Sequence, residues 1–221
     1  MNSITAATTA NLRERLQQLG RSTGAVHSLP VVLSGHAALD TRLPGGGWPL
    51  GALTELLSNA RGIGELGLLL PALIHLARSG RHIVWIAPPY LPYAPALAQQ
   101  GLPPERVLLI HTERPQDALW ATEQALRCPA VGAVLGWSAH IVDRSLRRLQ
   151  LAAETGGTFG ILHRPAEAAR EPSPAALRLG LVPTTDGLLL EIRKSRGARA
   201  GASVHLKHGD SMRVIRAMRA S

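Results

Sequence analysis

The feature that most constrains the fold is a regular alternation of short apolar runs with longer helix-compatible segments. The apolar runs are 52–57, 82–87, 106–110, 131–136 and 158–163. The segments between them, predicted as helices, are 65–79, 93–100, 115–127 and 140–155. Short continuous apolar strands separated by helices are typical of a parallel sheet covered on both faces. With right-handed crossovers, this pattern predicts a doubly wound α/β core.

The pattern changes after residue 165. The stretches "ALRLGLV", "GLLLEIRK" and "SVHLKH" alternate between apolar and polar residues, and "PTTDG" between the first two indicates a hairpin turn. We therefore expect antiparallel strands at the C-terminal side of a largely parallel, twisted sheet. Before the core, Leu12, Leu16 and Leu19 share one face of a short amphipathic helix. That helix is predicted either to dock a partner or to fold back on its own domain.

These patterns divide the chain into three parts. Residues 1–28 form an N-terminal helix and linker, residues 29–208 the core domain, and residues 209–221 a basic tail. The formal charge of the chain is +9, and the segment from Arg193 to the end holds eight of the 24 basic residues but only one acid. Such a segment favours nucleic acid or an acidic protein surface as its partner, with a solvated tail as the alternative.

Composition also bounds the compartment. The single cysteine, Cys128, excludes an intrachain disulfide and fits a reducing cytoplasm. The longest apolar run, Leu66 to Leu76, is interrupted and too short to span a bilayer. The first residues lack the basic start and apolar stretch of a secretion signal. We therefore predict a cytoplasmic protein without a membrane segment.

The loop after the first core strand lies where a nucleotide-binding protein has its phosphate loop. That loop needs G-x-x-x-x-G-K-[ST], so that backbone N–H groups, a lysine and a hydroxyl hold the phosphates and Mg²⁺. Here Ser58 replaces the first glycine, and Glu65 follows Gly64 where the lysine is required. Arg61 and Gly62 complete this degenerate loop. A carboxylate facing a triphosphate is repulsive, so we expect no nucleotide cofactor.

Other candidate chemistry is weak. The stretch "GWSAH" around Ser138 lacks the second glycine of a hydrolase nucleophile elbow, so a strand-to-helix connection is the better interpretation. The histidines are scattered without metal-ligand spacing. The four tryptophans fall at or beside predicted elements and are interpreted as core or interface residues.

Several segments resemble one known family. "LSGHAALDTRLPGGGWPLGALTELL" and "IAPPYLPYAPAL", together with "ARGIGEL" and "ALWATEQALR", resemble the ImuA family of RecA-like accessory proteins, which have often been labelled SulA-like. The resemblance runs from about Val32 to Leu206. It implies a RecA-like core that preserves the position of the phosphate loop.

Carrying RecA roles onto this chain position by position implies a protein that does not hydrolyse ATP. Trp137 stands where an Mg²⁺-associated aspartate is expected, Pro88 where the water-activating glutamate is expected, and His163 where the nucleotide-sensing glutamine is expected. Lys194 and Arg196 occupy the place of paired lysines that reach across a RecA subunit boundary. The cations around and after them are Arg193, Arg199, Arg213, Arg216 and Arg219. They are predicted to contact DNA or a partner, or else to lie in a solvated hairpin.

The resemblance implies a non-catalytic scaffold of SOS-induced error-prone translesion synthesis. Its implied partners are RecA, the inactive polymerase homologue ImuB, and through ImuB the error-prone replicative-type polymerase. DNA contact and homo-oligomerisation stay open. Two alternatives remain: a SulA-like inhibitor of cell division that binds a tubulin-like protein, and a DNA-stimulated ATPase with an unusual site. No metal and no cofactor are expected.

Overall fold

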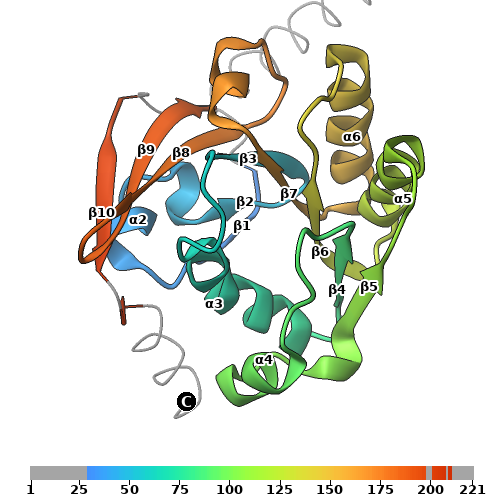
Figure 1. Cartoon of the computed structure of the whole chain (residues 1–221), viewed down its shortest axis with the longest axis horizontal. Helices are drawn as coiled ribbons and strands as arrows, with labels where there is room; N and C mark the ends of the chain where they lie inside the picture. The colour runs from blue at the N-terminus through green and yellow to red at the C-terminus, as the bar shows by residue number, and fades with distance from the viewer. Residues whose placement is uncertain (1–28, 198–200, 208, 211–221) are drawn as a thin grey trace, which may run out of the picture.

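The computed structural model describes residues 29–197, 201–207 and 209–210, and an eight-stranded sheet forms their centre (Figure 1). The strand order across the sheet is β10-β9-β8-β3-β7-β6-β4-β5. The strands are β3 (Ala52–Leu57), β4 (His82–Ile86), β5 (Val107–Ile110), β6 (Val131–Trp137), β7 (Phe159–Arg164), β8 (Leu177–Thr184), β9 (Gly187–Ser195) and β10 (Ser203–Lys207). The sequence thus predicted every strand of this sheet, with ends that differ by a residue or two.

The sheet is largely parallel. All neighbouring pairs from β5 to β8 run parallel, whereas β9 pairs antiparallel with β8 and β10 pairs antiparallel with β9. This confirms a parallel sheet extended by antiparallel strands at the C-terminal side. One detail differs from the expectation: β8 itself joins the parallel part, because it pairs with β3 from Thr54 opposite Leu177 to Leu57 opposite Gly180.

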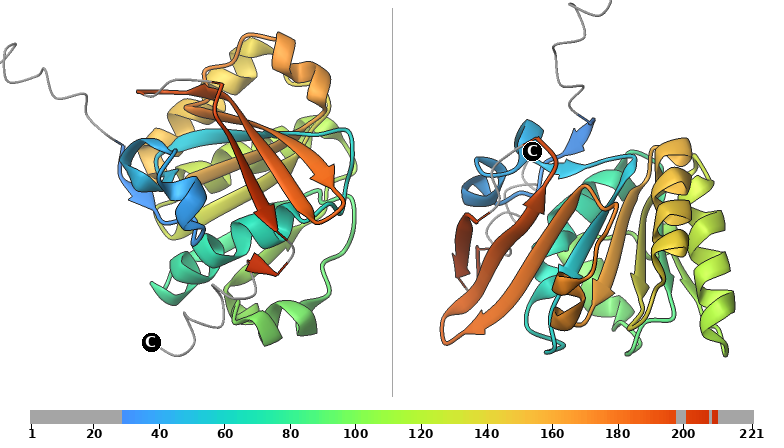
Figure 2. Two further views of the ribbon diagram at one scale, coloured as in Figure 1. Left: turned by 90° about the vertical axis from the view of Figure 1, so that its left-hand side faces the viewer. Right: turned by 90° about the horizontal axis from the view of Figure 1, so that it is seen from above.

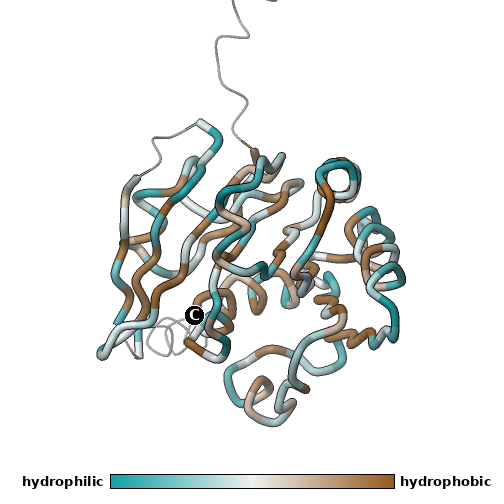
Figure 3. The backbone as a smooth tube through the Cα atoms, turned by 45° about the horizontal axis from the view of Figure 1, so that its top comes forward, coloured by the Kyte–Doolittle hydropathy of each residue, from teal (hydrophilic) through white to brown (hydrophobic). Residues whose placement is uncertain are grey.

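Helices cover both faces of the sheet (Figure 2). Helices α3 (Glu65–Arg78) and α4 (Ala94–Gln100) pack on one face, and α5 (Pro115–Arg127) and α6 (Asp143–Gly156) pack on the other. Mostly hydrophobic segments run along the strands between these layers (Figure 3). Alternate residues of one strand therefore enter different cores, as Leu53 packs with α6 and Leu56 with α3. The predicted mixed α/β class is confirmed.

A small antiparallel sheet precedes the core. It pairs β1 (Val31–Val32) with β2 (Trp48–Pro49), and α2 (Ala37–Asp40) and the 3-10 turn η1 (Pro44–Gly46) lie between them. Gly47 is required there because a Cβ atom at this position would lie 2.4 Å from the carbonyl oxygen of Val32. The Gly-Gly-Gly-Trp-Pro stretch thus serves a close backbone approach at the entrance to β3.

Two further 3-10 turns complete the described elements, namely η2 (Pro104–Arg106) and η3 (Ala166–Arg170). Among the described helices, none has both the length and the apolar content needed to cross a membrane. The predicted N-terminal helix with Leu12, Leu16 and Leu19, and the basic tail from residue 211, lie outside the described residues.

Candidate functional site

A cleft of about 540 Å³ opens at the carboxyl ends of the central parallel strands. Ligands of open α/β sheets bind at this edge, in the crevice outside the strand ends. The loops after β3, β4, β6 and β7 line the cleft. Its lining residues are Leu56, Ser58, Asn59, Ala60, Arg61, Ile63, Glu65, Ala87, Pro89, Trp137, Ser138, Ala139, His163, Arg164, Pro165, Glu167 and Leu181. The degenerate phosphate loop identified in the sequence therefore forms one wall of a real cleft.

The side chain of Glu65 folds back onto the loop between β3 and α3 and binds its backbone. The Glu65 Oε1 atom accepts a hydrogen bond from the Gly62 N–H at 2.9 Å, and Oε2 accepts one from the Ile63 N–H at 2.8 Å. Gly62 and Gly64 adopt positive φ angles of 68° and 104°, which direct the backbone into this tight curve. The carboxylate that stands where the sequence comparison expected a lysine thus binds two backbone N–H groups of the loop itself.

The base of the same loop is also tied down. The Ser58 N–H donates to the carbonyl of Arg164 at 3.0 Å, and the Ala60 N–H donates to Ser58 Oγ at 3.1 Å. Asn59 bridges to the η3 segment through Glu167, at 2.8 Å from its Nδ2 atom. Arg61 is the cation of this loop, and its side chain is exposed at the cleft. The loop is therefore held in shape by contacts within the chain.

Trp137 and His163 form an aromatic stack. They occupy the two positions where the resemblance to RecA led us to expect an aspartate and a glutamine. The rings of Trp137, at the end of β6, and His163, in β7, lie parallel with centroids 4.7 Å apart and an interplanar angle of 4°. Burial lowers the pKa of His163 to about 4, against the opposing influence of the Glu65 charge. The imidazole is therefore neutral near pH 7. Its Nε2 atom is buried and has no hydrogen-bond partner among the described residues.

Beneath the cleft, a buried ion-pair cluster joins three strands. Glu55 in β3 is fully buried and accepts from Arg164 Nη1 at 3.1 Å and from Arg178 Nε at 2.5 Å. Ser173 Oγ donates to the same carboxylate at 2.9 Å. The second Arg164 branch pairs with Glu171 at 2.7 Å. These contacts fix the segment after β7 against the sheet, so we assign Glu55 a structural role.

The C-terminal cations predicted to meet DNA or a partner are described only in part. Arg193 pairs with Glu191 on its own strand. Lys194 Nζ donates to the Ser173 carbonyl at 2.6 Å, and its pKa is lowered first by burial and then by the charges of Arg178 and Arg196. Arg196 is exposed. The positions Arg199, Arg213, Arg216 and Arg219 lie outside the described residues. A partner contact at Arg196 stays a prediction.

In the described part of the chain, Ser138 has no catalytic base as a hydrogen-bond partner. Its Oγ atom donates to the backbone carbonyl of His140 at 3.4 Å, and its N–H donates to the carbonyl of His163 at 3.1 Å. The interpretation as a strand-to-helix connection agrees with this geometry, although α6 begins only at Asp143. Among the described residues, no group of His, Cys, Asp and Glu side chains is arranged to hold a metal ion.

An exposed apolar loop borders the cleft. In the connection from β4 to α4, the side chains of Tyr90, Leu91 and Tyr93 are 70%, 72% and 73% exposed. We call these three residues the apolar loop. Beside it lies a second hollow of about 350 Å³, which shares Glu65, Trp137 and His163 with the main cleft. In the sequence, this stretch stands out only as part of the "IAPPYLPYAPAL" motif. The residue types alone do not show whether aromatic side chains on a proline-rich loop are buried or exposed.

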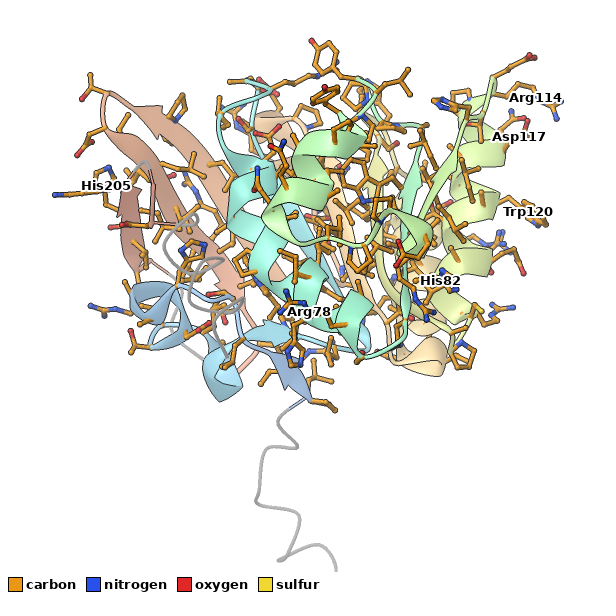
Figure 4. All side chains as sticks on the ribbon, turned by 90° about the horizontal axis from the view of Figure 1, so that it is seen from below. Arg78, His82, Arg114, Asp117, Trp120 and His205 are labelled. Atoms are coloured by element: carbon orange, nitrogen blue, oxygen red, sulfur yellow. The ribbon has the colours of Figure 1, made fainter. Side chains whose placement is uncertain are left out.

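The tryptophans divide between core and surface. Trp48 and Trp85 are buried, in agreement with the core interpretation. Trp120 is 64% exposed and projects from the outer side of α5, on the same side as Arg114 and Asp117 (Figure 4). Trp120 is not among the residues that line the cleft.

The core of this chain is similar in sequence to proteins of known function. A family model described as "Cell division inhibitor SulA" matches residues 51–160. The cell division inhibitor SulA of Serratia marcescens is 31% identical over 115 residues, which cover 52% of this chain and 68% of that protein. The protein of the same name from Pectobacterium carotovorum subsp. carotovorum is 33% identical over 131 residues, covering 59% of this chain and 75% of its own.

A third relative, the cell division inhibitor SulA of Pectobacterium atrosepticum, is 33% identical over 119 residues, covering 53% of this chain and 71% of its own length. Among solved structures, the crystal structure of SulA from Pseudomonas aeruginosa matches with 29% sequence identity and a TM-score of 0.42. That match covers 51% of this chain and 97% of that chain.

These matches overturn the assignment to the ImuA family. The partners RecA, ImuB and the error-prone polymerase, and the role in translesion synthesis and mutagenesis, are therefore wrong. The physical reason is clearest in the glycine-rich segment, where Gly47 serves the close backbone approach to Val32, so this motif reports on a turn of the fold and does not identify a partner. The relatives with these names align over more than two thirds of their own length, and the chain belongs to the SulA family.

Proposed function

We propose that this chain inhibits cell division by binding a tubulin-like division protein in the cytoplasm. The observation that carries the proposal is the position of the family match. Residues 51–160 include the loop with Glu65, the apolar loop and Trp137. The part of the chain shared with the division inhibitors thus supplies one wall of the cleft, while His163, Arg164 and the residues after them complete it.

We further propose that the chain acts by binding and not by turnover. A phosphate loop that hydrolyses nucleotide needs a lysine and a metal-holding hydroxyl, whereas Glu65 occupies the backbone donors of this loop. The aromatic stack of Trp137 and His163 fills the strand ends where acidic or amide groups would act. Both features support a surface that recognises a protein.

The proposed ancestry of the core is a RecA-type fold that has lost its nucleotide chemistry. Its support is the placement of the loop: it follows the central strand β3, precedes α3, and lies at the carboxyl edge of a largely parallel sheet with antiparallel strands appended. This ancestry explains why a division inhibitor carries a loop of phosphate-binding shape.

We propose that the apolar loop is the docking element. Large exposed apolar side chains grouped at one place mark interaction sites, and tyrosine is enriched among residues that dominate binding energy. Tyr90, Leu91 and Tyr93 form such a group beside the cleft. Their exposure means that polar replacements there should leave the fold intact.

Controlled expression in bacteria tests the function. The full-length chain should produce long, undivided cells, and Leu91→Ser combined with Tyr93→Ser should restore normal length. The matched control is Trp120→Ser, because Trp120 is similarly exposed but lies on α5 and does not line the cleft. Normal cell length on expression of the full-length chain, at protein levels confirmed by immunoblot, would refute the proposed function. Filamentation by the apolar-loop variant would refute only the docking element.

A further inference from the structure

The loop between β3 and α3 contains an anion supplied by the chain itself. Each oxygen of the Glu65 carboxylate accepts one backbone N–H, from Gly62 and from Ile63. Successive N–H groups that converge in a turn form an anion-binding concavity. The N-terminus of α3, a helix of 14 residues, adds its positive end at the same place. The loop therefore retains the geometry of an oxyanion site while its ligand is a side chain.

A second, independent feature lies in the lining of the same cleft. The Nε2 atom of His163 is buried, and it has no hydrogen-bond partner in the described part of the chain. Buried polar side-chain atoms without a partner are uncommon, and each one calls for an explanation. His163 lines both the main cleft and the adjoining hollow, as do Glu65 and Arg61. A neutral imidazole can donate one N–H to a bound oxygen atom.

We propose that Glu65 occupies a phosphate-type oxyanion site built from the Gly62 and Ile63 N–H groups with His163 and Arg61. The site takes a phosphate group when the carboxylate is removed. The cleft volume of about 540 Å³ exceeds that of a bare phosphate, so the group can be an inorganic phosphate or the end of a larger phosphorylated molecule. This inference stands apart from the proposed division function and does not depend on it.

The internal carboxylate explains how the loop stays folded without a ligand. A group tethered next to its site competes at a high effective concentration, and its negative charge repels an incoming phosphate. The full-length natural chain should therefore bind phosphate weakly or not at all. Removing the Glu65 carboxylate has two effects: it frees the N–H groups of Gly62 and Ile63, and it removes the charge that repels phosphate.

Calorimetric titration of the full-length chain with inorganic pyrophosphate tests the site. Glu65→Ala should bind pyrophosphate at least tenfold more tightly than the natural chain. Glu65→Gln should show a smaller gain, because its amide oxygen still accepts one loop N–H. The matched control is Glu167→Ala, which removes a carboxylate from the same cleft but one that contacts Asn59 and not the loop N–H groups. That control should bind as the natural chain does.

Two further arms identify what the site recognises. Adding His163→Phe to Glu65→Ala should reduce the gain, since the buried donor is lost. ADP binding to Glu65→Ala as tightly as pyrophosphate, or more tightly, supports an oxyanion site, whereas equal binding of adenosine would overturn it. The proposal is also overturned if folded Glu65→Ala gains no affinity, or if Glu167→Ala gains as much. Should Glu65→Ala fail to fold, Glu65→Gln decides: no gain in its pyrophosphate affinity overturns the proposal.

Discussion

Two glutamates near β3 have different kinds of partner: Glu55, within the strand, contacts arginine side chains, whereas Glu65, after the loop that follows the strand, contacts backbone N–H groups. Glu55 is fully buried and contacts the guanidinium groups of Arg164 and Arg178. Glu65 lies at the cleft, and its carboxylate accepts hydrogen bonds from two backbone N–H groups. The first carboxylate holds strands and loop together, whereas the second shapes a surface that faces solvent.

The two regions also differ in how they relate to the family. The partners of Glu65 lie inside residues 51–160, where the SulA family model matches. The partners of Glu55, namely Arg164, Ser173 and Arg178, all lie beyond that range. The matched range therefore contains Glu65 and both of its backbone donors, whereas His163 of the loop site and the partners of Glu55 lie in the C-terminal third of this chain.

The largest effect is expected at Glu55. Replacement by Gln leaves two buried guanidinium groups facing a neutral amide, and breaking a buried ion pair costs about 3–5 kcal/mol. We expect the free energy of unfolding, measured by urea denaturation, to fall by that amount. The control is Asp143→Asn, which removes an exposed pair with Arg147 and should leave the urea midpoint nearly unchanged. Equal losses in the two variants would contradict the structural role of Glu55.

The next effect concerns the aromatic stack and pH. The pKa of His163 is about 4 in the folded chain, below its ordinary value of 6.5. Between these values the unfolded chain binds the proton and the folded chain does not, so the free energy of unfolding falls as pH decreases from 6.5 to 4. At about 1.4 kcal/mol per pKa unit, the loss is roughly 3 kcal/mol.

His163→Phe isolates this term, because it keeps a ring against Trp137 and removes the titrating group. Urea denaturation at several pH values should show a shallower loss of stability for the variant between pH 6.5 and 4. Some dependence should remain, since burial also lowers the pKa of His36. If the free energy of unfolding depends on pH equally steeply in the variant and the natural chain, then His163 is not held in its neutral form by burial.

A smaller effect on stability is expected at Glu65. Glu65→Ala removes two hydrogen bonds of a partly exposed carboxylate, which costs about 1–2 kcal/mol. The loss should be local: hydrogen exchange should accelerate at the Gly62 and Ile63 amides, while amides of β3 keep their protection. Faster exchange throughout β3 would mean that Glu65 supports the core as Glu55 does, and the contrast between the two residues would fail.

The regular part of the fold could be predicted because it depends on local patterns. Continuous apolar runs separated by helical segments were sufficient for the strands and the parallel sheet. The pairing of β8 with β3 could not be read in this way, because strand order reflects packing between segments distant in the chain. The Glu55 cluster joins residues 109 and 123 positions apart, and no local signal indicates such a contact.

The candidate site could be predicted only in outline. The sequence placed a degenerate phosphate loop after β3 and named Glu65 as the residue that departs from the pattern. The contacts of Glu65 with the Gly62 and Ile63 N–H groups depend on positive φ angles at the two glycines, which the sequence permits but does not require. The stacking of Trp137 on His163 needs the register of β6 and β7, in which these two residues are paired.

The central claim is that the chain inhibits division by binding a tubulin-like division protein without nucleotide turnover of its own. Sedimentation of polymers of that division protein from the same organism tests it most directly. Adding the full-length chain at increasing ratios should reduce the pelleted polymer until the two proteins are near equal amounts, with the same result whether or not ATP is present. Polymer that is unaffected at equimolar amounts, or reduced only when ATP is added and hydrolysed, would contradict the account.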